Sequence, residues 1–404
     1  MNAKLVRTAI VLGLLSVIGP LAIDMYLPAL VQIGADLRAP DASVQLSLMA
    51  YMAAVAIFQL VYGPISDMFG RKPPLYFGMA VYVAGSIACA LAPSIELLIL
   101  GRFLQGVGAC ASMSLPRAIV RDNYTGAAAA QLMSLLMLVF SISPILAPLS
   151  GSIVIAFGDW RLLFWTMTLV GTLSFVLLVF GLEETRPKER RIGSSLGSAL
   201  GAYGQLLRDG RFLGLTLIGT FGMSSFMAFL GNSSFVYINH YGLTPTQYSL
   251  AFSVNAVSFF AVSQATAFLV RRFGLNRVVR IAVTGYAASM LGLFALYLLG
   301  FDSVWVLGVG MFVAFGFLGL VLPSTSVLAM EEQGEIAGSA SALMGTIQMI
   351  VAAGVMGVVG AFANGTAMPM VVGFAVCAVL AYAITQITLR GRNAASPAVA
   401  MPAE

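Results

Sequence analysis

Asp24 and Arg102 are the two charged residues of this sequence that stand deep inside long apolar stretches. Asp24 lies within VIGPLAIDMYLPAL, and Arg102 lies within LLILGRFLQGVGA. Inserting an ionisable side chain at the centre of a membrane costs about 2.5–3.5 kcal/mol of free energy. Such a residue is therefore a candidate for a functional role. Burial favours the neutral form of a carboxyl group, whereas a neighbouring arginine favours the charged form. The two residues together therefore have the chemistry of a proton site.

The positions of Asp24 and Arg102 along their expected helices predict that the two side chains meet. A span over residues 6–30 runs outward and places Asp24 about six residues from its outer end, and a span over 95–118 runs inward and places Arg102 about seven residues inside. At 1.5 Å per residue, both lie about 10 Å below the outer end. We interpret Asp24 as a proton site modulated by Arg102. The alternative interpretation is a permanent ion pair that fixes helix register.

Residues for other kinds of chemistry are scarce in this sequence. His240 is its single histidine, and Cys89, Cys110 and Cys377 lie separately in apolar runs without paired spacing. The sequences HExxH and GxxxxGK[ST], which mark metalloproteases and ATP sites, do not occur, and the sequence offers no Ser-His or Cys-His set for nucleophilic catalysis. We therefore expect no enzyme activity, no metal site, no cofactor and no use of ATP.

The composition places the two charged residues in a membrane protein. Of the 404 residues, 59% are hydrophobic and 9% are charged, whereas a soluble domain carries about 25% charged residues. The net charge of +5 does not predict nucleic-acid binding, because the basic residues are scattered singly and form no stripe. The solvent of this chain is therefore the lipid bilayer.

Continuous apolar segments of membrane-spanning length recur twelve times along the chain. Membrane barrels show alternating segments of about ten residues instead, so strands are not expected. The segments cover residues 6–30, 43–65, 74–93, 95–118, 128–157, 161–182, 212–236, 246–270, 278–300, 303–328, 336–363 and 366–389. The sequence predicts an all-α integral membrane protein with twelve transmembrane helices in two six-helix bundles.

The basic residues predict the orientation of these spans. With the N-terminus inside, eighteen of the 21 Lys and Arg residues fall on the cytoplasmic side, Arg38 and Arg161 fall outside, and Arg102 falls within a span. This asymmetry follows the positive-inside rule and puts both termini in the cytoplasm. One inner loop, residues 331–335, departs from the rule because it carries three glutamates and no base.

The longest expected loop divides the chain into two halves. We predict an N-terminal six-helix bundle over residues 1–182, a cytoplasmic linker over 183–211, a C-terminal six-helix bundle over 212–390 and a disordered cytoplasmic tail over 391–404. The linker contains a small-residue, weakly amphipathic stretch, LGSALGAYGQLLRDGRF. Six spans on each side indicate an internal duplication with a site between the halves near the midplane.

Four stretches resemble sequences of a known family of transporters. They are AIDMYLPAL (22–30), GPISDMFGRKP (63–73), RFLQGVGA (102–109) and APLSGSIVIAFGDWRLLFW (147–165). Together they are similar to the major facilitator superfamily and, within it, to the bicyclomycin/chloramphenicol-resistance (Bcr/CflA-type) drug:proton antiporters. The resemblance is dense over residues 20–185 and covers the second half mainly by span count.

The stretch at 63–73 is similar to a cytoplasmic gate motif of that superfamily. We expect its glycines to permit a tight turn and close helix packing. We expect Asp67 to accept hydrogen bonds from a helix N-terminus or to pair with Arg71, Arg117 or Arg121, and so to latch the outward-open state. Met68 stands where the family has a basic residue, which weakens this latch; the alternative is an ordinary solvated loop. The predicted gate residues are Gly63, Asp67, Gly70, Arg71, Lys72, Arg117 and Arg121.

The stretch at 147–165 resembles the antiporter motif of the fifth span. We expect this helix to bend, and to let a neighbouring helix approach closely, at Pro144, Pro148 and Gly151. Such a helix suits an interface whose packing must change. The resemblance implies exchange of drug for protons, and the alternative is a packing kink alone. Ser152 replaces the usual second glycine of the motif.

A pocket for lipophilic molecules is expected to be apolar and aromatic with a few polar anchors. The 21 methionines of the chain suit an adaptable pocket. Each candidate taken singly also fits ordinary helix packing. The predicted substrate-binding residues are Asp24, Met25, Tyr26, Tyr51, Val55, Gln59, Arg102, Phe226, Phe229, Asn232, Ser233, Phe235, Asn255 and Gln348.

These observations and the resemblance predict proton-coupled efflux of small lipophilic compounds such as phenicol- or bicyclomycin-like antibiotics. We expect a monomer in the bacterial inner membrane that works by alternating access, with the drug, protons and lipid as its partners. Neutral substrates are favoured because Gly13 and Ser16, not a second acid, occupy the inner part of the first span. The alternative is an exporter of sugars or other small metabolites on the same scaffold.

Overall fold

The apolar segments of the sequence form a bundle of long helices. The computed structural model describes residues 3–186 and 196–389. Within those ranges, eleven helices are long and apolar enough to cross a membrane, and the bent helix α6 makes twelve. The predicted all-α fold with twelve spans is therefore confirmed.

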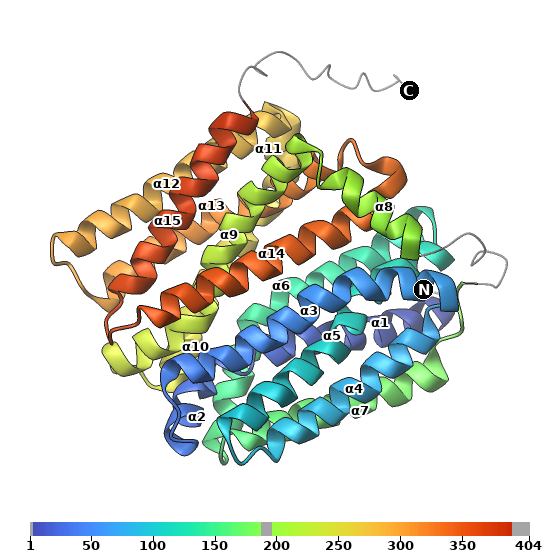
Figure 1. Ribbon diagram of the computed structural model, residues 1–404, viewed down its shortest axis with the longest axis horizontal. Helices are drawn as coiled ribbons and strands as arrows, with labels where there is room; N and C mark the ends of the chain where they lie inside the picture. The colour runs from blue at the N-terminus through green and yellow to red at the C-terminus, as the bar shows by residue number, and fades with distance from the viewer. Residues whose placement is uncertain (1–2, 187–195, 390–404) are drawn as a thin grey trace.

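The helices before the linker pack mainly against one another and form the first group (Figure 1). A 3-10 turn, η1 (Leu27–Ala29), separates its first two helices. The helices of the first group are α1 (Ala3–Asp24), α2 (Leu30–Asp36), α3 (Asp41–Phe69), α4 (Lys72–Ala90), α5 (Ile95–Asn123), α6 (Gly126–Ala156) and α7 (Arg161–Gly181).

The helices after the linker form the second group, which meets the first along α3 with α14 and α6 with α10 (Figure 1). A π-helical turn, η3 (Phe235–His240), continues α9, and a 3-10 turn, η4 (Gly334–Ile336), precedes α14. The helices of the second group are α9 (Gly210–Ser234), α10 (Pro245–Gln264), α11 (Thr266–Phe273), α12 (Leu275–Leu298), α13 (Val304–Met330), α14 (Ala337–Ala361) and α15 (Met368–Thr388).

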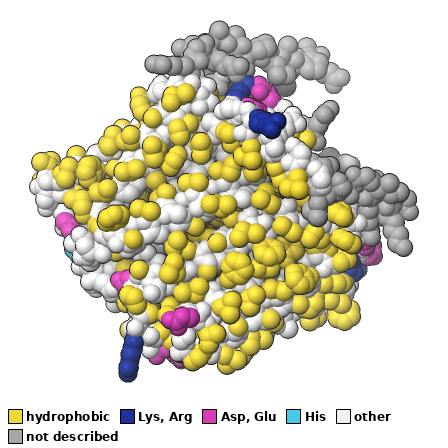
Figure 2. Space-filling view, in the orientation of Figure 1, with side chains coloured by type: hydrophobic (Ala, Val, Ile, Leu, Met, Phe, Trp, Pro, Cys, Tyr) yellow, Lys and Arg dark blue, Asp and Glu magenta, His cyan; other side chains and the backbone are white. Residues whose placement is uncertain are grey.

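The lipid-facing surface of the molecule is apolar. Figure 2 shows one face covered by hydrophobic side chains, with charged side chains toward its edges. Phe157, Phe180 and Trp305 are each at least 80% exposed. Such exposure is favourable in hydrocarbon, where helices satisfy their own backbone hydrogen bonds.

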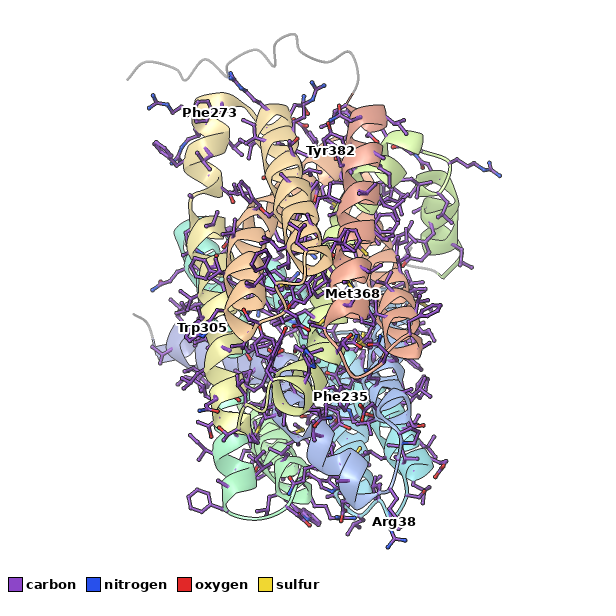
Figure 3. The ribbon with its side chains drawn as sticks, turned by 90° about the vertical axis from the view of Figure 1, so that its left-hand side faces the viewer. Arg38, Phe235, Phe273, Trp305, Met368 and Tyr382 are labelled. Carbon is purple, nitrogen blue, oxygen red and sulfur yellow. The ribbon has the colours of Figure 1, made fainter. Side chains whose placement is uncertain are left out.

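The two ends of the bundle are named after the predicted orientation. The inner end carries Arg71, Arg186 and Arg211, and the outer end carries Arg38. Figure 3 shows Arg38 and Phe273 at opposite ends of the molecule. Short α8 (Leu196–Leu206) lies in the linker at the inner end, against α3 and α14. The predicted tail (391–404) and the basic residues Lys188, Arg190, Arg191, Arg390 and Arg392 lie outside the described residues.

Proline and glycine explain two local features of the helices. Helix α6 bends by 40° between Phe140 and Ile142, because Pro144 has no N–H for the carbonyl of Phe140. Gly70 ends α3 at a φ of 97°, where glycine is favoured. The close helix approach expected at Gly63 is wrong, since a Cβ placed there would meet nothing within 4 Å.

The first span is longer than the sequence suggested. Helix α1 ends at Asp24, but η1 and α2 continue the same span, which runs from Leu5 to Asp36. The predicted end at residue 30 is therefore too early. Asp24 lies twelve residues before Asp36, which puts it about 18 Å from the outer end.

Candidate functional site

Asp24 is buried at a break in the first span. Its side chain is 4% exposed and forms neither an ion pair nor a hydrogen bond with the described residues. Gly151 of α6 packs against this break so closely that a Cβ there would lie 2.2 Å from the carbonyl oxygen of Met25. The predicted antiporter helix therefore directly supports the backbone next to Asp24.

Arg102 is held by aromatic rings at the centre of the first group. Its guanidinium carbon lies 4.5 Å from the ring centroid of Tyr26 and 4.6 Å from that of Tyr51, and Phe164 lies at 5.9 Å. We call these three rings the aromatic cage. Nη1 of Arg102 donates to the side chain of Gln105, while Nε and Nη2 find no acceptor among the described residues. The cation is stabilised by π faces rather than by a carboxylate.

The predicted contact between Asp24 and Arg102 is wrong for this conformation. The ion pairs among the described residues do not join them, and Arg102 faces the cage instead. Depth does not separate the two residues, because Arg102 stacks on Tyr26, which lies two residues after Asp24 in the first span. The guanidinium packs on the rings of Tyr26 and Tyr51 instead of on the carboxyl group.

Polar side chains behind the cage fix its members. The hydroxyl groups of Tyr26 and Ser47 lie 2.7 Å apart, and Gln105 donates to Ser86 over 2.8 Å. Sequence analysis missed Gln105 as a site residue, although its place three residues after Arg102 in RFLQ puts both on one helix face. Ser47 and Ser86 carry no such signal, because only tertiary packing brings them to the site.

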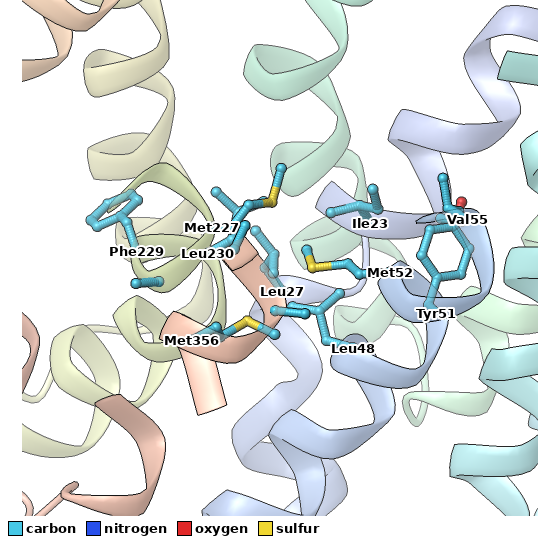
Figure 4. Close-up of a cluster of buried hydrophobic side chains, with 14 of the residues drawn as sticks. Ile23, Leu27, Leu48, Tyr51, Met52, Val55, Met227, Phe229, Leu230 and Met356 are labelled. Carbon is cyan, nitrogen blue, oxygen red and sulfur yellow. The ribbon is translucent and has the colours of Figure 1, made fainter. Parts of the chain in front are cut away.

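The two groups of helices touch near the outer end. Nε2 of Gln45 donates to Oδ1 of Asn232 over 3.0 Å, and the hydroxyls of Ser249 and Ser253 donate to the carbonyls of Pro148 and Ile145 over 3.0 and 2.8 Å. Buried apolar side chains fill the space beside these bonds (Figure 4). We call this cluster the outer seal; its members include Ile23, Leu27, Leu48, Met52, Met227, Leu230 and Met356.

A cavity of about 1230 Å³ separates the two groups toward the inner end. Helices α3, α5 and α6 line one wall, and α13 and α14 line the other, with Tyr203 of α8 between them. We call it the inner cavity. The structure is therefore closed at the outer end and open at the inner end.

The inner cavity contains some of the predicted substrate-binding residues but not most of them. Val55, Gln59 and Gln348 line it. The others lie at the break in the first span, in the cage, in the outer seal or in the packed second group. There Phe229 stacks on Phe252 with centroids 5.5 Å apart, and Ser233 lies 3.0 Å from the Tyr248 hydroxyl. The predicted residues outside the cavity lining are Asp24, Met25, Tyr26, Tyr51, Arg102, Phe226, Phe229, Asn232, Ser233, Phe235 and Asn255.

The predicted gate motif forms an ionic cluster at the inner end of the first group. Arg71 donates to Asp67 over 2.8 Å and to Asp122 over 2.7 Å, and Arg186 lies 3.1 Å from Asp67. Although partial burial works against the charged form, these carboxylates raise the pKa of Arg71 above its ordinary value. Asp122 and Arg186 were not predicted.

Arg117 and Arg121 do not join this cluster. Both line the inner cavity, as do Gly63, Asp67 and Arg71. Of the three arginines expected to pair with Asp67, Arg71 does so, whereas Arg117 and Arg121 do not in this conformation, because Arg71 and Arg186 already occupy the carboxylate. The described contacts of the cluster all lie within the first group, as an open inner end requires.

Comparisons with known proteins agree with this architecture. The chain is 38% identical over 369 residues to an uncharacterized MFS-type transporter, YdgK, of Bacillus subtilis (strain 168), with 90% of each protein covered. It is 30% identical over 388 residues to a protein named bicyclomycin resistance protein homolog of Haemophilus influenzae, with 95% of this chain and 97% of the relative covered. A solved D-xylose-proton symporter shares its fold, with a TM-score of 0.76 at 14% identity over 96% of this chain and 98% of that one.

The family model extends over most of both groups of helices. The model described as Major Facilitator Superfamily matches residues 12–356. That range includes the cage, the outer seal and the gate cluster. The protein is accordingly a multi-pass membrane transporter rather than an enzyme, and the chain belongs to the Major Facilitator Superfamily.

Proposed function

We propose that this protein exports small lipophilic drugs in exchange for protons, with Asp24 as the proton site. The observation that carries the proposal is the burial of Asp24 at a helix break without a cation or hydrogen-bond partner among the described residues. A buried carboxylate without a partner is costly, so this conformation favours the protonated, neutral acid. The relative named for bicyclomycin resistance supports drug as the cargo.

The exchange cycle follows from what each conformation offers to Asp24. In the inward-open form the drug enters the inner cavity, and Asp24 gives up its proton when water or Arg102 comes to stabilise the carboxylate. The N–H groups of Arg102 that lack acceptors are available for that contact. The two groups then rock, the outer seal opens, and the drug leaves as Asp24 takes a proton from outside.

The lining of the inner cavity favours lipophilic cargo over sugars. Its deeper part contains Val55, Met113 and Met349, with the amides Gln59 and Gln348 as polar anchors. Methionine-rich walls adapt to apolar molecules of different shape. Sugar sites usually need several amides and carboxylates, so an excess of sugar is expected not to compete with drug.

We further propose the membrane placement that the charge count predicts. The protein lies in the bacterial inner membrane as a monomer, with both termini in the cytoplasm, and the predicted bundles at 1–182 and 212–390 move as two units about the linker. The inner cavity then opens to the cytoplasm, where a drug would be loaded. Labelling of single cysteines at Arg38 and Phe273 by an impermeant thiol reagent in intact cells tests this orientation, since only the first is expected to react.

The test of the function is Asp24→Asn in inverted membrane vesicles. Asparagine keeps the size and polarity of the side chain but cannot release a proton. We expect efflux of a neutral phenicol driven by a proton gradient to be lost, while the protein remains in the membrane and still binds the drug. Asp302→Asn, at an exposed acid of the outer end, is the matched control and is expected to transport normally. Gradient-driven transport by Asp24→Asn would overturn the proposal.

A further inference from the structure

The charged side chains of the inner cavity are distributed unevenly between its two walls. In the described part of the chain, its charged lining residues are Asp67, Arg71, Arg117, Arg121 and Glu331. Asp67 and Arg71 neutralise each other within the gate cluster. The remaining charges are two arginines on α5 and one glutamate on the opposite wall, at the end of α13.

Arg117 and Arg121 have no carboxylate partner among the described residues. They lie one turn apart on α5, on the face that Ser114 also presents to the cavity. Asp122 comes directly after them, but its carboxylate is occupied by Arg71 and by the hydroxyl of Thr185. The guanidinium of Arg117 instead lies 5.4 Å from the centroid of the Phe140 ring.

Two like charges at this spacing repel each other, so an unneutralised pair is not explained by stability. A cleft with walls of low dielectric also focuses the field of the charges that line it, and this field acts on any ion that enters. Glu331 lies on the far wall and can offset at most one of the two positive charges. The net field along the α5 wall is positive.

We propose that Arg117 and Arg121 select cargo by charge: they exclude lipophilic cations from the inner cavity and favour neutral or anionic lipophilic molecules. This inference rests on the proposed export of lipophilic drugs and names the substrate class. An anionic or acceptor-rich group of the cargo contacts the two guanidiniums. The apolar body of the cargo lies deeper, against Met113 and Met349.

Two ions of nearly equal size and opposite charge test the proposal. Tetraphenylborate and tetraphenylphosphonium binding is measured by calorimetry on the purified full-length protein in phosphatidylcholine nanodiscs, with empty nanodiscs subtracted. The wild type is expected to prefer tetraphenylborate by about tenfold or more. The variant with Arg117→Gln and Arg121→Gln is expected to lose about tenfold of that preference. Arg121→Glu is expected to shift the preference toward the cation.

The matched control removes two inner positive charges that do not line the cavity. Arg272 and Arg277 are exposed near Phe273 of the second group, so the variant with Arg272→Gln and Arg277→Gln is expected to keep the wild-type preference. A purely mechanical role of Arg117 and Arg121 in closing the cavity would change the affinity for both ions alike. Equal preference in the wild type and in the Arg117 and Arg121 double variant, or binding of neither ion, would overturn the proposal.

These measurements are made without a proton gradient, so they do not depend on Asp24. Loss of proton coupling would show in the vesicle assay with Asp24→Asn and would leave the charge preference intact. Conversely, a drug exporter without charge selection would pass the vesicle assay and fail the binding assay. The two proposals therefore fail separately.

Discussion

Arg102 shows how a cation can be kept inside the first group of helices without an anion. The rings of Tyr26 and Tyr51 lie on the guanidinium at 4.5 and 4.6 Å, and Gln105 accepts one of its N–H bonds. A buried cation–π contact is worth about 2 kcal/mol, so two of them offset part of the desolvation cost. Because its Nε and Nη2 have no acceptor in the described part of the chain, the residue retains capacity to bind a carboxylate that comes within reach.

Arg102→Lys tests whether the planar guanidinium, rather than its charge alone, is needed in the cage. An ammonium keeps the charge but cannot stack between two rings and reach Gln105 together. We expect the free energy of unfolding to fall by about 2 kcal/mol, and drug efflux to fall by about tenfold or more. Thermal unfolding of the purified protein and vesicle transport measure the two effects.

Arg161→Lys is the control for this substitution, because Arg161 lies at the outer end and pairs with Asp36 over 2.8 Å with partial exposure. Exposed ion pairs contribute little, so this variant is expected to unfold close to the wild type. If Arg102→Lys were as stable and as active as the wild type, the cage would not be what holds the cation.

The sequence predicted the residues of the site better than their contacts. Asp24 and Arg102 are recognisable because charge is rare among apolar residues. Their predicted contact was wrong because the rings of Tyr26, Tyr51 and Phe164 surround the guanidinium of Arg102 instead. The cage needs α1, α3, α5 and α7 in one place, and single-sequence patterns do not carry that information.

At the scale of elements, the packing of α6 on the first span brings the predicted antiporter helix against the proposed proton site. Gly151→Ala is expected to destabilise the protein by about 1–3 kcal/mol, because its Cβ would lie 2.2 Å from the Met25 carbonyl oxygen. Because the added Cβ would meet backbone atoms of Met25 rather than a flexible side chain, the first span must shift near Asp24 to accommodate it. Thermal unfolding measures the loss, and efflux is expected to fall with it.

Gly292→Ala on α12 is the matched control for Gly151→Ala, since a Cβ at Gly292 would meet nothing within 4 Å. Alanine there is expected to leave stability unchanged or to raise it by up to about 1 kcal/mol. Equal melting temperatures for the two variants would show that the close approach of α6 and α1 is not required.

Glu184 predicts a pH dependence at the inner end. Partial burial opposes its charged form, but backbone N–H groups of Arg186, Arg71, Lys72 and Thr185 donate to it at 2.9–3.1 Å and lower its pKa. A lowered pKa stabilises the fold above the ordinary value of a glutamate, and the contribution is lost as the pH falls through the lowered pKa. Glu184→Gln is therefore expected to melt below the wild type at about pH 7 and to converge with it as the pH falls through the lowered pKa of Glu184.

The comparison of the two melting curves across pH removes effects common to both proteins. A constant difference between wild type and Glu184→Gln over the whole range would contradict the role of the charge. Parallel loss of stability in both proteins at low pH is expected from other carboxylates, and it does not affect the difference.

The positions of the helices were predicted well from the apolar runs and from the residues that interrupt them, such as proline. All twelve predicted segments correspond to helices, and the bend in α6 lies where Pro144 leaves the Phe140 carbonyl without its N–H donor. Sequence patterns failed at the break between Asp24 and Leu30, where Pro28 marks an interruption but the span continues through α2 to Asp36. Tertiary packing decides the conformation there.

At the scale of the whole molecule, three of the hydrogen bonds between the two groups lie toward the outer end, whereas the cavity lies toward the inner end. A fourth, from the Thr346 hydroxyl to the Ala56 carbonyl, lies beside residues that line the cavity. Gln45 to Asn232, Ser249 to Pro148 and Ser253 to Ile145 are bonds of the closed outer end. Each joins residues from different groups, so each must break if the inner cavity is to close and the outer end is to open. These bonds therefore stabilise the inward-open form.

A covalent bridge across the outer seal is expected to trap the inward-open form. Gln45 and Asn232 approach within 3.0 Å through their amides, so cysteines at both positions lie within reach of a short bis-methanethiosulfonate reagent. We expect the bridge to stop drug efflux, and reduction to restore it. Binding of a neutral phenicol to the bridged protein is expected to remain, because the inner cavity lies toward the opposite end.

The single variants Gln45→Cys and Asn232→Cys treated with the same reagent separate bridging from modification. Neither can link the groups, so both are expected to keep most of their transport. Continued efflux by the bridged double variant would mean that the outer seal does not open during turnover. In that case the cargo would leave by another route, and the assignment of Gln45 and Asn232 to the moving contact between the groups would be wrong. Loss of drug binding on bridging would instead place part of the cargo site within the seal itself, among residues such as Asn232 that the sequence assigned to the pocket.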